Sequence, residues 1–308
     1  MRCTSPRSVG FKSDGKTIAW SLKTISIKYP GFQLPCGKCI ECRLDYARQW
    51  AIRCVHESKM HEKNAFITLT YDDQHLLDPK LDYSDFQKFM KKLRKLQNDP
   101  MGVFVTGEYG GKTKRKHWHA LIFGWSPSDG VYKYSNDRGD KSFSSETLNK
   151  IWGKGIAEYG AVTFQSAGYC ARYAAKKLVH GHDDAHELHP ISKKSSKHAI
   201  GKSWLEKYWP DVFLQGHVVL GDGTTVGIPR YYEKWLKEHR PDDWLRYVTQ
   251  VKFAKCDSAR AKALAEHLEF REMVDARRNG MTYPKTPNQR RNEIAQENLK
   301  RLQANLKL

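Results

Sequence analysis

The sequence predicts an α+β fold: a central, mostly antiparallel sheet flanked by helices, followed by a basic helical C-terminal extension. Three observations support this prediction. Short segments rich in β-branched and aromatic residues alternate along the chain with amphipathic segments of helical period. Residues 102–108 and 117–124 are two such strands separated by a glycine-containing turn, which indicates a hairpin. From about Asp242 onward the chain is charged and mostly helical in pattern.

The first predicted elements are a strand, a helix and a strand. Residues 17–28 partly alternate between polar and apolar side chains, as in a strand. Residues 43–62 have helical period, with Trp50 and Cys54 on the apolar side. Residues 65–71, Ala-Phe-Ile-Thr-Leu-Thr-Tyr, are rich in strand-forming residues.

An amphipathic helix is predicted over residues 84–96, with Asp82 or Ser84 as its N-cap. Its apolar positions have helical spacing and are Phe86, Phe89, Met90 and Leu93. The later elements are predicted as a polar loop over 126–141, a helix over 145–152, a strand over 156–164, a helix over 167–178, a polar loop over 180–202 and a small hairpin over 218–226. The predicted domains are an N-terminal segment of residues 1–14, a main domain of residues 15–235 and a basic helical extension of residues 236–308.

Composition indicates a protein that works on nucleic acid. The 308 residues carry a formal net charge of +19, which favours a polyanionic partner because neutralised phosphates release counterions. Nine Trp and fifteen Tyr offer faces on which unpaired bases can stack. The alternative is a solvated basic surface with its aromatic residues in the core. Seven cysteines, no signal peptide and no long apolar run predict a soluble intracellular protein with reduced thiols and no membrane contact.

His117 and His119 are two residues apart on a predicted strand, so both imidazoles point to the same face of the sheet. Glu108 lies on the preceding strand, and a hairpin closed through residues 112–116 brings its carboxylate beside them. Two imidazoles and a carboxylate suit Mg²⁺ or Mn²⁺, with positions left open for phosphate oxygens and water. The alternative is a pair of exposed strand histidines beside a basic turn.

Tyr169 and Tyr173 are four residues apart on the next long predicted helix, and this spacing places them on one face. A phenol with a pKa near ~10 is a poor nucleophile unless it is activated. A nearby divalent ion, together with the ammonium of Lys176 or Lys177, would supply that activation. The alternative is two core tyrosines.

Further basic residues could contact the phosphate backbone of DNA, the alternative for the turn being simple solvation. They are Lys112, Lys114, Arg115, Lys116, Arg172 and Lys177.

Three cysteines are spaced as Cys-x-x-Cys-x-x-Cys at Cys36, Cys39 and Cys42. This spacing can hold a structural zinc ion if a fourth ligand joins them, for which Cys3, Cys54 and His56 are the candidates. An iron–sulfur cluster is a second reading. The third is a turn of reduced, partly buried cysteines that bind no metal.

The order of a Glu strand, a His-Trp-His strand and a Tyr-x-x-x-Tyr-x-x-Lys helix resembles the HUH endonuclease superfamily, and within it the two-tyrosine replication initiators. More narrowly, the sequence resembles the replication initiators of microviruses, especially the gokushovirus branch. The resemblance spans roughly residues 35–235. It rests on the segments 35–43, 49–53, 66–71, 107–110, 117–124, 169–177 and 229–234.

The resemblance implies an endonuclease that nicks single-stranded DNA at a replication origin and rejoins strands in rolling-circle replication. It makes Glu108, His117 and His119 metal ligands, Tyr169 and Tyr173 alternating nucleophiles that link to the 5′ phosphate, and Lys176 the helix lysine. The chain has no P-loop, so a host helicase would unwind the DNA and a host polymerase would extend the free 3′-OH, in the bacterial cytoplasm.

Two other functions are compatible with the same residues. A transposase or relaxase of the HUH superfamily would use the same ligands, although the tyrosine pair argues against the single-tyrosine transposases. A non-enzymatic, zinc-stabilised nucleic-acid-binding protein would account for the charge and the cysteines. A metal requirement for strand cleavage separates the enzymes from the binding protein.

Overall fold

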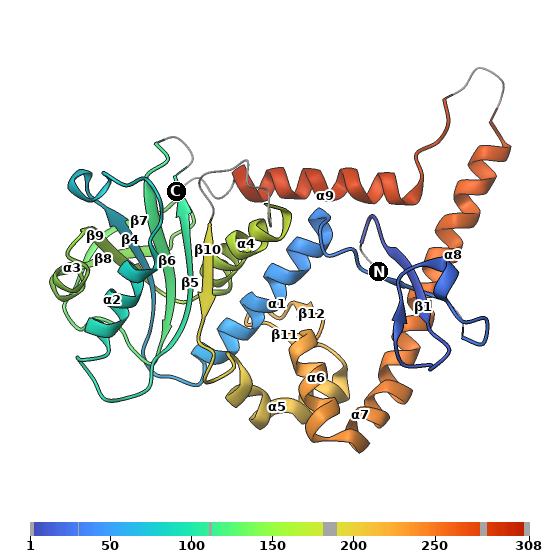
Figure 1. The fold of residues 1–308 in the computed structure, drawn as a ribbon, viewed down its shortest axis with the longest axis horizontal. Coiled ribbons are helices and arrows are strands. Elements are labelled where there is room, and N and C mark those ends of the chain that lie inside the picture. The colour runs from blue at the N-terminus through green and yellow to red at the C-terminus, as the bar shows by residue number, and fades with distance from the viewer. Residues whose placement is uncertain (1–2, 30, 111–112, 181–189, 278–281, 305–308) are drawn as a thin grey trace. The chain divides into compact units, whose positions relative to one another are not determined.

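The structure is a computed structural model that describes residues 3–29, 31–110, 113–180, 190–277 and 282–304. The chain divides into two compact units, which are described separately (Figure 1). Unit 1 comprises Met1–Asp45 and Thr249–Leu308, and unit 2 comprises Tyr46–Val248. Among the described residues, no helix combines the length and the apolar character that crossing a lipid bilayer requires.

A seven-stranded antiparallel sheet forms the centre of unit 2, as the sequence predicted. The spatial order of its strands is β10-β5-β6-β4-β9-β8-β7. Their bounds are β4 Asn64–Tyr71, β5 Gly102–Tyr109, β6 Lys116–Phe123, β7 Gly130–Ser135, β8 Lys141–Ser145, β9 Gly155–Gly160 and β10 Ile191–Lys194. A separate small hairpin joins β11 Val218–Val219 to β12 Thr225–Val226, where the sequence placed one.

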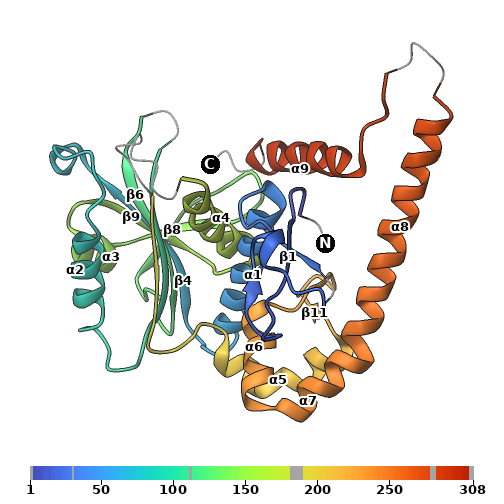
Figure 2. The same cartoon turned by 45° about the vertical axis from the view of Figure 1, so that its right-hand side comes forward.

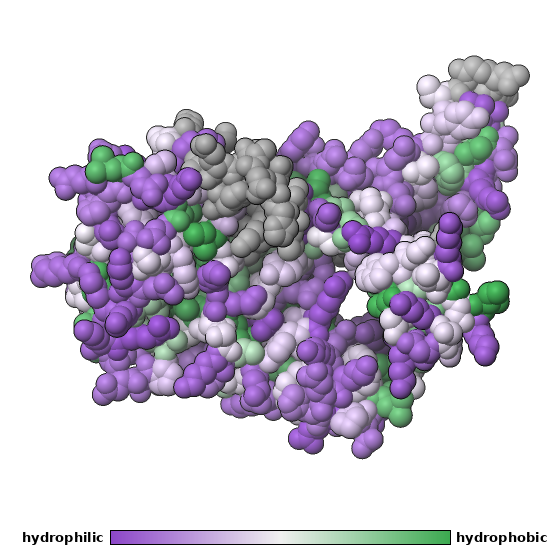
Figure 3. All heavy atoms as spheres, in the orientation of Figure 1, coloured by the Kyte–Doolittle hydropathy of each residue, from purple (hydrophilic) through white to green (hydrophobic). Residues whose placement is uncertain are grey.

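Helices surround this sheet and continue beyond it. Their bounds are α1 Ile40–Ser58, α2 Tyr83–Leu93, α3 Glu146–Trp152, α4 Phe164–His180, α5 Lys202–Gln215, α6 Arg230–His239 and α7 Pro241–Tyr247, with a 3-10 turn η2 at Asp73–His75 and a π-helical turn η3 at Val248–Lys252. The Asp82 carboxylate accepts a hydrogen bond from Ser84 N and caps α2, whose four predicted apolar residues are buried. Its opposite face carries exposed lysines, and Figure 3 shows hydrophilic side chains over α2.

Each face of the sheet supports its own hydrophobic core because the side chains of a strand alternate between the two faces. Trp118, Ala120 and Ile122 of β6 pack with α2 and α3 on one face. Leu121 and Phe123 lie on the other face, in a core shared with α1 and α4. Figures 1 and 2 both show α2 and α3 on one side of the sheet and α4 on the other.

Three predicted segments differ from the structure. Residues 126–141, predicted as a loop, contain β7, and all six residues of β7 are exposed, so it lacks the polar–apolar alternation of a half-buried strand. The predicted loop 180–202, of which residues 181–189 lie outside the described residues, contains β10, a short polar strand that forms by pairing with β5. The predicted strand 17–28 is reduced to β2, Ile18–Ala19.

Unit 1 contains a small sheet and two long helices. The sheet has the order β2-β1-β3, in which β1 is Arg7–Phe11 and β3 is Phe32–Leu34, and a 3-10 turn η1 spans Leu22–Thr24. The helices are α8 Phe253–Asp275 and α9 Pro287–Ala304, joined by an ion pair between Glu266 and Arg291. Both helices lie in the extension that the sequence predicted to be helical.

His56 of α1 is buried in unit 2 between two aromatic rings. Its ring centroid lies 3.4 Å from that of Trp204, and its Nδ1 lies 2.8 Å from the hydroxyl of Tyr232. Burial, aided by the charge of Lys59, lowers the pKa of His56 to about 3. An unfolded chain binds a proton at this position below pH ~6.5, whereas the folded chain excludes it down to about pH 3. The contribution of neutral His56 to stability is therefore complete above that range and is lost as the pH falls through it.

We expect this difference to cost the wild-type protein about 2 kcal/mol of unfolding free energy between pH 7 and pH 5. His56→Asn should flatten the pH dependence of denaturant unfolding in this window, whatever its effect at pH 7. His267→Asn, at an exposed position of α8, is the matched control and should leave the slope unchanged. Equal slopes in wild type and His56→Asn would contradict the prediction.

Candidate metal centre

The hairpin of β5 and β6 brings together the three side chains that the sequence predicted as metal ligands. Its register pairs Glu108 with His117 and Thr106 with His119. Since residues opposite one another in an antiparallel pair share a face, all four side chains lie on the face covered by α1 and α4. The hairpin and the common face that the sequence predicted are both present.

One carboxylate oxygen is the meeting point of this cluster. Glu108 Oε1 lies 3.0 Å from His117 Nε2 and 3.0 Å from His119 Nε2. Glu108 and His119 are buried, whereas His117 is partly open to solvent. The ligand atoms of the three residues all lie within 4.8 Å of one another, which is close enough for one ion to contact all of them.

The outer ring nitrogens are held by neighbouring groups. His117 Nδ1 lies 3.0 Å from the carbonyl oxygen of Arg115, which can only accept, so Nδ1 carries the proton. In the neutral ring, Nε2 then directs its lone pair at the Glu108 oxygen. Two lone pairs face each other at this distance only if a cation lies between or beside them. His119 Nδ1 is held by the hydroxyl of Thr68 at 3.0 Å.

Two atoms of the cluster also lack hydrogen bonds. Glu108 Oε2 and His119 Nε2 are buried and have no hydrogen-bond partner among the described residues, although His119 Nε2 is close to Glu108 Oε1. Unsatisfied buried polar atoms are costly, and a divalent cation would satisfy both. The residues therefore fit a metal ion, and one carboxylate with two imidazoles suits Mg²⁺ or Mn²⁺.

The protonation states of the cluster also suit a cation. Burial raises the pKa of Glu108, but the adjacent His117 and His119 outweigh this effect, so the pKa lies below its ordinary value. Burial lowers the pKa of His119, and Glu108 opposes this only in part. The site thus holds a carboxylate beside a neutral imidazole, and these are the forms that bind metal.

Tyr169 reaches the same point from α4. Its hydroxyl donates a hydrogen bond of 2.9 Å to Glu108 Oε1, and its ring lies edge-on to His119 at a centroid distance of 4.9 Å. At the start of α4, Ser166 N donates to Thr163 Oγ1 and Thr163 N donates to Ser166 Oγ, a reciprocal cap that fixes where the helix begins. The structure therefore places one phenol at the metal-type cluster.

The other residues of the predicted site are less fully described. Tyr173, Lys176 and Lys177 belong to α4, but their side chains lie outside what the structure describes. Lys112 also lies outside the described residues. Arg172 is partly buried on α4.

The basic turn before His117 has contacts of its own. Lys114 is exposed and adopts a left-handed backbone conformation, with φ at 53°. Arg115 donates from Nη1 to Tyr71 O at 2.8 Å and forms an ion pair with Asp73. Lys116 is buried, and its Nζ donates to the carbonyl oxygens of Asp78 and Lys80. Of the turn residues that the structure describes, Lys114 is thus the most accessible to a phosphate backbone.

Sequence reasoning missed Thr68, which the structure places behind His119. The signal for it was present, since Thr68 is a polar residue in the alternating strand β4 and lies opposite His119 in the register. Its role could be recognised only after β4 was known to pair with β6.

Thr68→Val removes the hydroxyl that holds His119 Nδ1 and keeps a similar side-chain shape. We expect the dissociation constant for Mn²⁺ to rise about 10- to 100-fold, since losing the outer partner of a metal-bound histidine has effects of this size. Thr68→Ser keeps the hydroxyl and should retain wild-type affinity. Isothermal titration of the purified chain with Mn²⁺ measures both variants. Equal affinities for Thr68→Val and the wild type would show that the hydroxyl does not position the ring.

A second cluster of metal-type ligands lies in unit 1. Cys36, Cys39 and Cys42 come together there with Cys3. The other two candidates for a fourth ligand are elsewhere, because Cys54 is buried in the core beneath the sheet and His56 is stacked on Trp204. The structure thus selects Cys3 from the three alternatives that the sequence left open.

Comparison with known proteins points to one family. The family model for the replication-associated protein ORF2 matches residues 64–178, a range that contains the Glu108–His117–His119 cluster and α4 up to Leu178. The chain is 43% identical to the replication-associated protein VP4 of Bdellovibrio phage phiMH2K, with all of both chains covered. It is 33% identical to the replication-associated protein ORF4 of Chlamydia phage 1, over 70% of this chain and 57% of that protein.

A third relative is the replication-associated protein ORF2 of Spiroplasma virus 4, which is 29% identical over 79% of this chain and 78% of that protein. No solved structure matches the chain. The full-length match to the phiMH2K protein decides the family, and the chain belongs to the replication-associated proteins of microviruses.

Proposed function

We propose that this protein is the replication initiator of a small circular DNA genome, a metal-dependent HUH endonuclease that nicks single-stranded DNA through a tyrosine and later rejoins the strands. The observation that carries the proposal is the convergence at Glu108 Oε1 of His117 Nε2, His119 Nε2 and the hydroxyl of Tyr169. It places a phenol nucleophile against a ligand set suited to a divalent ion. The net charge of +19 and the family supply the expected substrate, DNA.

Glu108, His117 and His119 would hold Mg²⁺ or Mn²⁺, which when bound would polarise the phosphate at which cleavage occurs. Tyr169 is within hydrogen-bond distance of Glu108, so its hydroxyl is already at that position. Its oxygen attacks phosphorus and loses the phenol proton. The bond from phosphorus to the 3′ oxygen breaks, and that oxygen gains a proton. The products are a 5′-phosphotyrosine and a free 3′-OH.

A covalent link of this kind conserves the energy of the broken bond, so strand joining needs no nucleoside triphosphate. Tyr173 lies one helical turn after Tyr169 on α4, and we propose it as the second nucleophile that cuts the regenerated origin. Lys176 or Lys177 would stabilise the phenolate, while Lys112, Lys114, Arg115, Lys116 and Arg172 would contact the DNA backbone. A host helicase and a host polymerase in the bacterial cytoplasm would supply unwinding and synthesis.

The proposed nuclease domain spans residues 15–235, between the N-terminal segment of residues 1–14 and the basic extension of residues 236–308. Its assignment to the HUH fold rests on the ligand strands and the tyrosine helix. The seven-stranded antiparallel sheet with helices on both faces is compatible with that assignment.

The test is formation of a covalent adduct. The full chain is incubated with Mn²⁺ and the circular single-stranded form of its own genome, and the products are separated on denaturing gels. The proposal predicts an SDS-resistant protein–DNA adduct that EDTA prevents, and mass spectrometry of the digested adduct should find the nucleotide on Tyr169 or Tyr173. DNA that is bound on native gels but neither nicked nor linked with Mg²⁺ or Mn²⁺ would instead indicate a binding protein without nuclease activity.

A further inference from the structure

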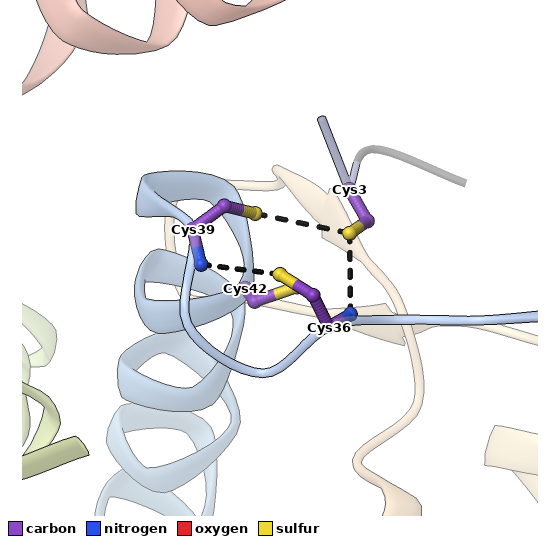
Figure 4. Close-up of side chains that lie close together, drawn as sticks. All are labelled: Cys3, Cys36, Cys39 and Cys42. Atoms are coloured by element: carbon purple, nitrogen blue, oxygen red, sulfur yellow. Dashed lines mark hydrogen bonds between the residues drawn. The ribbon is translucent and has the colours of Figure 1, made fainter. Parts of the chain in front are cut away.

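Four cysteines from separate parts of unit 1 gather around one small space (Figure 4). Cys3 belongs to the N-terminal segment, Cys36 and Cys39 to the loop before α1, and Cys42 to the first turn of α1. Their four Sγ atoms all lie within 4.8 Å of one another. All of them are free thiols, so no disulfide accounts for the arrangement.

The spacing of the sulfurs matches a single tetrahedral ion. Four thiolates bound to zinc at about 2.3 Å form a tetrahedron whose edges measure about 3.8 Å. The distance between Cys39 Sγ and Cys3 Sγ is 3.8 Å. A cluster of several irons with bridging sulfides needs more room between its cysteine ligands. We propose that Cys3, Cys36, Cys39 and Cys42 bind one structural Zn²⁺ ion.

The backbone around the cluster is arranged to accept negative sulfur. Cys36 N donates to Cys3 Sγ at 3.3 Å, and the amides of Lys38 and Cys39 donate to Cys36 Sγ at 3.4 and 3.2 Å. Gly37, at φ +75°, permits the turn that points both amides at one sulfur. These donors lower the energy of thiolates, which are the form that binds zinc.

The helix that follows adds to this effect. α1 begins at Ile40, so Cys39 and Cys42 lie at its N-terminal end, where the helix dipole favours negative charge. Lys38 and Arg43 add positive charge next to the two ligands in the sequence. A zinc ion with four thiolates has a net charge of about −2, which these groups offset.

The ligand set indicates a structural role. All four positions of the tetrahedron are filled by protein, so none remains for a substrate or water. Bound zinc would close the loop from Cys3 to Cys36 and fix the first turn of α1. Because such a site does not exist in the unfolded chain, the free energy of metal binding contributes to folding. The site is distinct in chemistry from the Glu108–His117–His119 cluster, and the proposal does not depend on nuclease activity.

Metal content of the purified full chain tests the proposal. After dialysis against dilute EDTA to empty a carboxylate–imidazole site, mass spectrometry should find about one zinc per wild-type chain. Cys3→Ser and Cys39→Ser should lower zinc affinity more than about a hundredfold, because the loss of an outer partner alone costs up to that much. Cys256→Ser, at an exposed cysteine of α8, is the matched control and should keep the zinc. His119→Ala should also keep it.

Cobalt replacement provides a second measurement on the wild-type chain. Bound Co²⁺ should show an intense thiolate-to-cobalt charge-transfer band and the strong visible bands of tetrahedral cobalt, whether or not the cysteine variants fold. Cys3→His, which offers a nitrogen ligand, should retain metal that Cys3→Ser loses. A wild-type chain without zinc after growth in zinc-supplemented medium would overturn the proposal. Stoichiometric zinc in Cys39→Ser, or cysteines found as disulfides, would also overturn it.

Discussion

Replacing both Tyr169 and Tyr173 by phenylalanine should lower adduct formation by more than about ten-thousandfold, the scale of loss when a catalytic nucleophile is removed. Phenylalanine keeps the rings that pack beside α4 and removes only the hydroxyls. The hydroxyl of Tyr169 donates to Glu108, so its loss also deletes the one phenol that the structure places at the cluster. Denaturing gels with labelled single-stranded DNA measure the rate.

Three controls make this result specific. Binding of single-stranded DNA by the double variant, measured by fluorescence anisotropy, should stay within about threefold of wild type, because the basic residues that meet phosphates are unchanged. Tyr283→Phe, at an exposed tyrosine in unit 1, should leave adduct formation intact. Each single variant should form an adduct only through the tyrosine that remains. Adduct formation by the double variant at the wild-type rate would refute the tyrosine mechanism.

His119→Ala should lower the Mn²⁺-dependent cleavage rate by about a thousandfold and abolish Mn²⁺ binding at the cluster. His119 is the most buried of the three ligands, so water cannot replace its imidazole in the same geometry. Isothermal titration should show the loss of binding independently of cleavage. His217→Ala, at an exposed histidine, serves as the matched control. If His119→Ala binds Mn²⁺ with wild-type affinity, the cluster is not the metal centre.

The three ligands of the candidate site could be predicted from sequence because their geometry is local. His117 and His119 share a face by the two-residue period of a strand, and Glu108 joins them through a hairpin of adjacent strands. Only one turn separates the two strands, so no long-range information was needed. The helical spacing of Tyr169 and Tyr173 could be predicted for the same reason.

Features that depend on long-range pairing could not be predicted. β10 is a polar Ile-Ser-Lys-Lys segment whose only indication of being a strand is its partner β5. Thr68 meets His119 because β4 pairs with β6, across 51 positions in the chain. Cys3 is separated from Cys36 by 33 positions, and its equivalence in type to Cys54 hid which residue completes the cluster. Each contact depends on tertiary structure, which outweighs local preference.

The outer strand β7 has a consequence for how copies of this protein behave at high concentration. It is an edge strand with every residue exposed, including Val131, Tyr132 and Tyr134, and such an edge invites pairing with another chain. The irregularity between Tyr132 and Tyr134 breaks the regular ladder, and Lys133 in the same place carries a charge held by Glu158. A strand from a second molecule would find neither a continuous row of backbone partners nor an uncharged surface. The apolar edge is thereby protected against sheet-to-sheet aggregation.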